Sequence, residues 1–338
     1  MNAPFAKCLL PVVLAVVALL QASAAYAQLM KTNFAVSVTS ESMAAVWVAA
    51  DRGLFRKNGL EMQLILIPRA PLSIAALTAG EIDLAITGTG HLLNAATGGA
   101  EVIGIANLSQ KLDFTLNGRP EIKKGEDLRG KKLAISGPGA TSHIVALLAL
   151  QKLGIDPNQA KISMITIPGT ELNRRLALES GTVDATTLKG AMGDVYARKG
   201  YPVLFDFKGS GIIMPQTVIL TTRQIVSTKP QLLEGYLKSI IEGIAFVMEP
   251  ANKEFVVKTL ATKLRLSKPS DAEESYQSVT QQYERVPYFN VEGLKKLNSV
   301  LTTINPKLAN VNPETVVDNS VVTKIDHSGF IQALYAKH

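Results

Sequence analysis

Residues 132–142 read Lys-Leu-Ala-Ile-Ser-Gly-Pro-Gly-Ala-Thr-Ser, a short β-type run followed by a turn of small residues and the start of a helix. That helix continues to a glycine stop at Gly154, and a second β-type run ends at Pro168. Residues 34–42, Phe-Ala-Val-Ser-Val-Thr-Ser-Glu-Ser, begin the same succession, which ends at Pro68. The two prolines are 100 residues apart, and this spacing indicates an internal duplication.

The likeness extends beyond the two prolines. After Pro68 the pattern predicts a short helix that ends at Gly80 and then a strand, and after Pro168 it predicts a short helix that ends at Gly181 and then a strand. Each copy therefore predicts a β-α-β-α-β unit, because parallel strands need helical crossovers between them. The predicted fold class is α/β. Ligands of such units bind beyond the carboxyl ends of the strands, so two facing units would share one cleft.

The composition is that of an ordinary globular protein. The chain has 338 residues, of which 47% are apolar and 19% charged, and this balance excludes disordered and fibrous classes. The length is typical of about two domains. The net charge of +7 is spread along the chain without a block of five basic residues, so it favours anionic partners weakly and does not indicate nucleic-acid binding.

Residues 1–27 have the pattern of a secretory signal peptide. An apolar run from Cys8 to Leu20 follows the single charge of Lys7, and the segment closes with Ala-Tyr-Ala at residues 25–27. Cys8 is the only cysteine, so the exported chain is predicted to lack disulfides, thiolate metal sites and a cysteine nucleophile. We therefore expect a periplasmic protein.

Three motifs resemble one family of transport proteins. Val-Trp-Val-Ala at residues 46–49, followed by Gly-Leu-Phe at 53–55, is similar to the opening of ABC-transporter periplasmic solute-binding proteins of the nitrate/sulfonate/taurine/bicarbonate type. Ala-Leu-Thr-Ala-Gly-Glu-Ile-Asp at residues 76–83 and Asp-Leu-Arg-Gly-Lys-Lys-Leu-Ala at 127–134 resemble two further segments of that family. The related thiamine-pyrimidine-precursor-binding proteins share these features.

The resemblance implies a type II periplasmic-binding-protein fold with two α/β lobes joined by two hinge strands. We expect lobe 1 to include residues 28–110 and 216–338, and lobe 2 to include residues 111–215, with hinges at roughly 108–118 and 214–222. It also implies a small-molecule solute and the permease of an inner-membrane ABC transporter as partners, and a monomer without a cofactor.

The first helix of each predicted unit offers a place for an anionic or polar group, because the leading N–H groups of a helix lack partners there. Small residues before the helix let a ligand approach the backbone. The alternative is a plain helix cap and turn. The candidate residues at these two helix starts are Ser40, Glu41, Ser42, Gly139, Ala140, Thr141 and Ser142.

Charged and hydroxyl groups near the other strand ends complete the predicted site. Arg69 follows the second strand and could pair with a carboxylate, sulfonate or phosphate, or it could be a solvated surface group. Glu41 could bind a ligand amine or could point to solvent. Two predicted strand-end loops, one in each unit, supply the remaining candidates, which are Thr87, Thr89, His91 and Lys189.

Several residues have readings that the sequence leaves open. Trp47 could stack on a flat ligand, but an aromatic residue at helical spacing is more often core. His91 and His143 could approach each other across the cleft, yet two histidines make a weak metal signal and we expect no metal. A Ser142–His143 catalytic pair is disfavoured because helix neighbours point in different directions.

Three classes of function are compatible with these features. The preferred one is a solute receptor that captures a small anionic or zwitterionic organic solute for a transporter and catalyses no reaction. A cysteine-independent enzyme or a pyrimidine-precursor-binding protein of the same fold is the alternative. A sensor module that has lost its transporter is the third.

Overall fold

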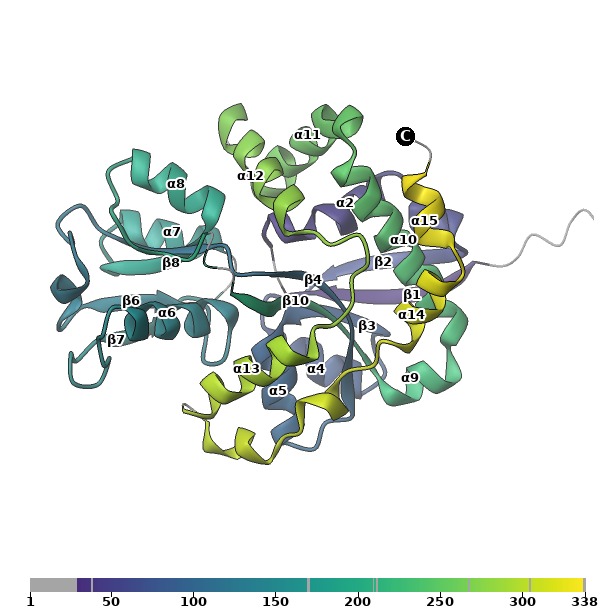
Figure 1. The fold of residues 1–338 in the computed structure, drawn as a ribbon, viewed down its shortest axis with the longest axis horizontal. Helices are drawn as coiled ribbons and strands as arrows, with labels where there is room; N and C mark the ends of the chain where they lie inside the picture. Colours follow the sequence, from purple (N-terminus) through teal and green to yellow (C-terminus); the bar gives the residue numbers. More distant parts are fainter. Residues whose placement is uncertain are drawn as a thin grey trace, which may run out of the picture.

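The computed structural model describes residues 29–37, 39–168, 171–208, 210, 212–266, 268–303 and 305–336. Two separate five-stranded sheets, each flanked by helices, divide the described chain into two lobes (Figure 1). The predicted signal peptide, residues 1–27, lies outside the described residues. None of the helices in the described ranges combines the length and apolar character needed to cross a membrane.

The sheet of lobe 1 has the strand order β2-β1-β3-β10-β4. β1 pairs in parallel with β2 and β3, whereas β10 is antiparallel to β3 and β4. Its strands are β1 (Met30–Val36), β2 (Leu60–Leu66), β3 (Leu84–Gly88), β4 (Val102–Lys111) and β10 (Ile213–Thr222).

The sheet of lobe 2 repeats this arrangement with the order β7-β6-β8-β5-β9. β6 pairs in parallel with β7 and β8, and β5 is antiparallel to β8 and β9. The duplicated α/β units predicted from the sequence are therefore confirmed. The strands are β5 (Phe114–Gly118), β6 (Lys132–Ile135), β7 (Ser163–Thr166), β8 (Ala185–Lys189) and β9 (Val203–Asp206).

Among the described elements, the chain passes from one sheet to the other twice, and the two crossings lie side by side. The first lies between β4 and β5, inside the predicted hinge at 108–118. The second lies between β9 and β10, where Leu112 N donates a hydrogen bond to Ile212 O at 3.1 Å. Residues 214–222 are not this crossing, because they already pair with β3 and β4 in lobe 1.

Crossover helices flank both sheets. The first helical stretch of lobe 1 is interrupted at Gly53, whose φ of 66° is left-handed. In lobe 1 the helical segments are η1 (Glu41–Met43), α2 (Ala44–Asp51), α3 (Leu54–Lys57), α4 (Ala70–Thr78) and α5 (Thr89–Thr97). In lobe 2 they are η2 (Gly125–Leu128), α6 (Thr141–Lys152), α7 (Glu171–Glu179) and α8 (Gly190–Arg198).

The C-terminal helices cover lobe 1, as Figure 1 shows. α10 packs on α2, and its Tyr236 meets Phe34 of β1 edge to face with ring centroids 4.7 Å apart. α12 also contacts α8 of lobe 2. These helices are α9 (Arg223–Thr228), α10 (Pro230–Met248), α11 (Lys253–Leu264), α12 (Pro269–Gln282), α13 (Val291–Thr302), α14 (Ser320–His327) and α15 (Phe330–Tyr335). Short 3-10 turns between them are η3 (Pro250–Asn252), η4 (Pro306–Asn310) and η5 (Pro313–Val316).

Candidate functional site

A cavity of about 550 Å³ lies between the lobes, where the chain leaves β1 in lobe 1 and β6 in lobe 2. Both predicted helix starts reach it, because Thr39 and Gly137 are among its lining residues. Eight of the candidate residues line it, namely Ser40, Arg69, Thr87, His91, Ala140, Thr141, Ser142 and Lys189. Polar lining residues that the sequence analysis did not select as candidates are Ser37, Thr39, Ser136, Thr166, Glu171, Arg174, Gln216 and Thr217.

Four candidate residues do not line the cavity. Ser42 is fully buried and its hydroxyl lies 3.1 Å from that of Thr217, so it supports the wall from behind. Thr89 is also buried, in the first turn of α5. Gly139 lies against lobe 1, and its backbone N–H bonds to Nδ1 of His143 at 3.0 Å. Glu41 is buried among other residues.

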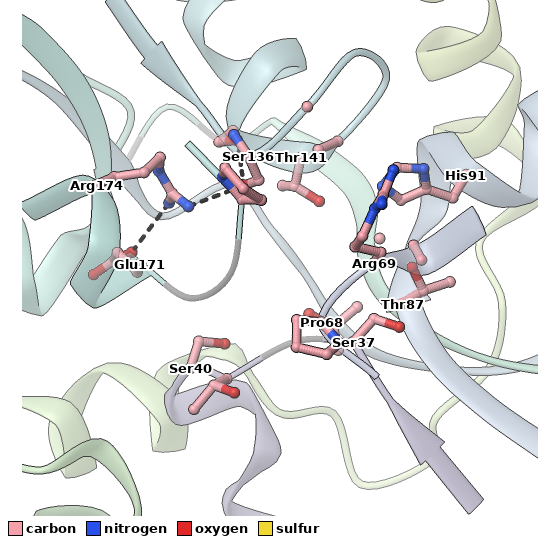
Figure 2. A pocket seen from close by; sticks show the side chains of 18 of the residues that line it. Ser37, Ser40, Pro68, Arg69, Thr87, His91, Ser136, Thr141, Glu171 and Arg174 are labelled. Carbon is pink, nitrogen blue, oxygen red and sulfur yellow. Dashed lines mark hydrogen bonds and ion pairs between the residues drawn. The ribbon is translucent and has the colours of Figure 1, made fainter. Parts of the chain in front are cut away.

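The lobe 2 wall contains a buried arginine corner (Figure 2). Arg174, which is 5% exposed, donates from Nη1 to Ser136 Oγ at 2.9 Å. Ser136 Oγ and Ser142 Oγ are 2.8 Å apart, so the chain of contacts runs from the guanidinium to the first turn of α6. Glu171 Oε2 lies 3.9 Å from Arg174 Nη2. Arg174 Nε has no hydrogen-bond partner among the described residues.

Burial lowers the pKa of Arg174, whereas the nearby Glu171 carboxylate raises it. A guanidinium remains cationic in proteins, so this corner presents a partly desolvated positive charge. Such a charge beside a helix start favours an anion in the cavity.

The lobe 1 wall supplies a second arginine. Arg69 stands at the N-cap of α4 and is exposed, and it lines the cavity from the side opposite Arg174 (Figure 2). Thr87, in the same wall, is fully buried and its hydroxyl has no partner among the described residues. Thr87 belongs to β3 and Lys189 is the last residue of β8, so neither lies in the strand-end loop predicted for it.

Glu41 does not point to solvent, because its carboxyl is buried with 5% exposure. Oε1 accepts a long hydrogen bond from Ser278 Oγ at 3.4 Å. Burial raises the pKa of Glu41 to about 7, while the positive charge of Lys189 acts in the opposite direction. Glu41 does not line the cavity, so the reading in which it binds a ligand amine has no direct contact to support it.

Lys189 lines the cavity, but its ammonium is used within the protein. Nζ donates to Gln282 Oε1 at 2.5 Å and to Ser109 Oγ at 3.4 Å, and both partners belong to lobe 1. Gln282 Nε2 in turn donates to Asp113 Oδ2, in the first crossing, at 2.8 Å. Lys189 therefore ties lobe 2 to α12 and to the crossing.

The two lobes touch at the edge of the cavity. A Cβ added to Gly90 of α5 would stand 2.1 Å from the carbonyl oxygen of Gly139 in lobe 2. A Cβ added to Gly88 would stand 2.8 Å from Thr141 Oγ1. The absence of side chains at these two glycines allows the lobes to approach this closely.

The histidines have separate environments. Burial lowers the pKa of His91 to about 4, so it is neutral at pH 7. His143 lies next to a different cavity, between α6 and α13, and accepts a hydrogen bond from Gly139. No group of three or more metal-binding side chains occurs within the described ranges. Ser142 and His143 do not form a pair, since Ser142 Oγ bonds to Ser136.

Trp47 is 6% exposed and packs in the core of lobe 1, which supports its structural reading. Arg174 is the main residue that the sequence analysis missed. It shares the buried face of α7 with Leu178, one helical turn later, and an arginine at apolar spacing is the signal that could have identified it.

Two duplicated α/β lobes, connected by two adjacent crossings around one shared cavity, define a type II periplasmic-binding-protein fold. The chain belongs to the NMT1/THI5-like family, whose model matches residues 40–253. A provisionally named binding protein of Brucella abortus (strain 2308) is 24% identical over 226 residues, which cover 65% of this chain and 67% of that relative.

Solved structures agree on the fold. The alkanesulfonate-binding protein of Xanthomonas axonopodis pv. citri bound to MOPS matches with a TM-score of 0.71 and 18% identity, covering 86% of this chain and 99% of that one. A desulfurization enzyme matches less well, with a TM-score of 0.60 and 12% identity over 88% of this chain and 99% of that one. At these identities the likeness concerns the fold.

Proposed function

We propose that this protein is a periplasmic receptor that captures a small organic anion between its lobes and presents it to the permease of an ABC importer. The observation that carries the proposal is the pair of arginines, one from each lobe, in a single interlobe cavity. A ligand that contacts both walls would stabilise the closed arrangement of the lobes.

The charge of the lining supports an anionic ligand. The described lining residues include Arg69, Arg174 and Lys189 as cations and Glu171 as the carboxylate. The helix start of α6 adds partial positive charge on the same wall. The Xanthomonas alkanesulfonate-binding protein of the same fold makes a sulfonate a reasonable member of the proposed ligand class.

The enzymatic alternative is motivated by the desulfurization enzyme of the same fold. Two acid–base groups with shifted pKa values, His91 and Glu41, argue against it. His91 is neutral and has a strongly lowered pKa, and Glu41 is separated from the cavity. A general base must lie within hydrogen-bond reach of the proton that it removes, and Glu41 does not.

Ligand-dependent thermal stabilisation tests the receptor function. The purified protein is screened with sulfonates, nitrate, carboxylates, pyrimidines and aromatic acids. A true ligand at 100 times its Kd should stabilise the fold by about 3 kcal/mol. Absence of a shift across the whole panel would count against the receptor. Turnover of a stabilising compound, followed by mass spectrometry, would favour the enzyme instead.

A further inference from the structure

The size of the cavity indicates an organic ligand. A water molecule occupies about 30 Å³ in the liquid, so a cavity of about 550 Å³ would hold an inorganic anion with most of its volume left to water. Cavities between about 300 and 1,000 Å³ are typical of sites for small organic molecules. The lining also includes apolar surface from Pro68, Phe114, Pro138 and Pro168, which suits a carbon skeleton.

The positive charges in this cavity are not equally available to a ligand. The ammonium of Lys189 is bonded to Gln282 and Ser109. Arg69 has no ion-pair partner among the described residues. Arg174 donates from Nη1 to the neutral Ser136 hydroxyl, and its Nη2 lies 3.9 Å from Glu171 Oε2, so its charge is only loosely paired. Two guanidinium groups therefore remain for a ligand.

These two guanidinium groups belong to opposite walls. Arg69 precedes α4 in lobe 1, and Arg174 lies in α7, the corresponding helix of lobe 2. Figure 2 shows them on opposite sides of the view, with Ser136 and Thr141 between them and Ser37, Ser40 and Pro68 below. An acid group that pairs with one guanidinium leaves the guanidinium on the other wall for a second acid group.

We infer that the ligand of this cavity is an organic dianion, a dicarboxylate or sulfocarboxylate whose two acid groups are separated by an apolar spacer. One acid group pairs with Arg174 and Ser136 in lobe 2, and the other pairs with Arg69 in lobe 1. This inference rests on the proposed function and narrows its ligand class. Pairing of each guanidinium with an acid group gives both affinity and orientation.

A zwitterion fits these contacts less well. Its amine would need a carboxylate on the wall, and Glu171 is the carboxylate that the described lining offers. Oε2 of Glu171 already accepts a hydrogen bond from Lys189 N at 3.0 Å and lies near Arg174. An amine there would also be repelled by the Arg174 guanidinium.

Matched ligands test the inference by titration calorimetry on the full purified chain at low ionic strength. One set is 4-sulfobutyrate, butanesulfonate and 4-aminobutanesulfonate, and a second is terephthalate, benzoate and 4-aminomethylbenzoate. Within each set the members share a skeleton and are a dianion, a monoanion and a zwitterion. We expect the dianion to bind at least tenfold more tightly than the other two in at least one set.

Arg69→Gln should then reduce the ratio of dianion to monoanion affinity toward one. Arg56→Gln is the control, because Arg56 is an exposed arginine of α3 that does not line the cavity, so the ratio should stay as in the wild type. The melting temperature of each variant reports whether it is folded.

Two outcomes distinguish failure of the dianion inference from failure of the proposed receptor function. If monoanions, zwitterions or nitrate bind and the dianions bind no more tightly, the dianion is excluded and the receptor stands. If no compound of these sets or of the wider panel binds, both are rejected. A dianion advantage that survives Arg69→Gln would also overturn the assignment of the two acid groups.

Discussion

The two lobes have the same strand order, but at equivalent positions one lobe has a neutral side chain where the other has a charged one. In lobe 1, Ser37 follows the first strand and its hydroxyl lies 2.7 Å from that of Ser73, the fourth residue of α4. In lobe 2, Ser136 follows the first strand and accepts a hydrogen bond from Arg174, the fourth residue of α7. The duplication thus supplies one scaffold, and single substitutions decide which wall holds a buried charge.

The same contrast recurs at the third strand of each lobe. β3 ends at Gly88 and β8 ends at Lys189, and the next helices have Gly90 and Ala191 at their second positions. Glycine in lobe 1 lets lobe 2 approach, whereas lysine in lobe 2 reaches into lobe 1. At equivalent positions, therefore, one lobe has a small residue and the other has a cation. The cation Arg174 lines the cavity, and the cation Lys189 joins the two lobes.

Replacing Arg174 with serine, the residue at the equivalent position of lobe 1, should have the largest effect on ligand affinity. Arg174→Ser removes the buried guanidinium, and we expect affinity for an anionic ligand to fall by roughly 100-fold, or about 3 kcal/mol. Titration calorimetry measures the change. Arg175→Ser is the matched control, because Arg175 is the next residue of α7 and does not line the cavity. Equal losses in both variants would exclude a specific role for Arg174.

The second prediction concerns two titrating groups that lobe 1 has and lobe 2 lacks. Between pH 4.5 and 7 folded Glu41 keeps its proton while unfolded Glu41 loses it, so Glu41 makes stability fall as pH rises. Between pH 4 and 6.5 unfolded His91 is protonated while folded His91 is neutral, so His91 makes stability rise with pH. The corresponding positions in lobe 2, residues 137–142 and Met192, carry no titratable side chain.

These opposed contributions, each at most about 3 kcal/mol, should largely cancel in the wild type between pH 4.5 and 6.5. Urea unfolding across pH 4.5–8 should show stability that rises with pH in Glu41→Gln and falls with pH in His91→Gln. Parallel curves for the wild type and both variants would mean that neither side chain has a shifted pKa.

The third and smallest expected effect is at the contact between lobes. Gly90→Ala gives lobe 1 the methyl that Ala191 already has in lobe 2, but here it meets the backbone carbonyl of Gly139. Overpacking typically costs about 1–3 kcal/mol, so we expect ligand affinity to fall by roughly tenfold as the lobes are held apart. Small-angle scattering should detect a larger radius for the ligand-loaded variant.

Gly98→Ala at the end of the same helix is the control for Gly90→Ala. The nearest atom to its added Cβ is Ala95 O at 3.5 Å, an ordinary contact. If Gly90→Ala binds the ligand with the same affinity as the wild type and Gly98→Ala, the close approach of the lobes has no role in ligand binding.

The sequence predicted the parts of the fold that depend on local pattern. β-type runs, glycine stops and the prolines at Pro68 and Pro168 placed the parallel strands of both units, because these signals act within a few residues.

The sequence did not predict which polar side chains are buried, because burial depends on segments far apart in the chain. Arg174 and Arg175 are adjacent, and only the packing of α7 against lobe 2 decides that the first is buried at the cavity. Glu41 is covered by α12, more than 230 residues away, through Ser278. The second crossing was predicted at residues 214–222, but these residues belong to β10 of lobe 1. Ile213–Thr222 is one β-type run, and such a run does not show which sheet it joins.

A crystal structure of the protein with a bound anionic solute tests most directly whether both halves of the duplication hold one ligand. We predict electron density for the ligand in the interlobe cavity, with one acid group against Arg174 and Ser136 and the other against Arg69. A ligand bound outside this cavity, or held by residues of one lobe alone, would contradict the account.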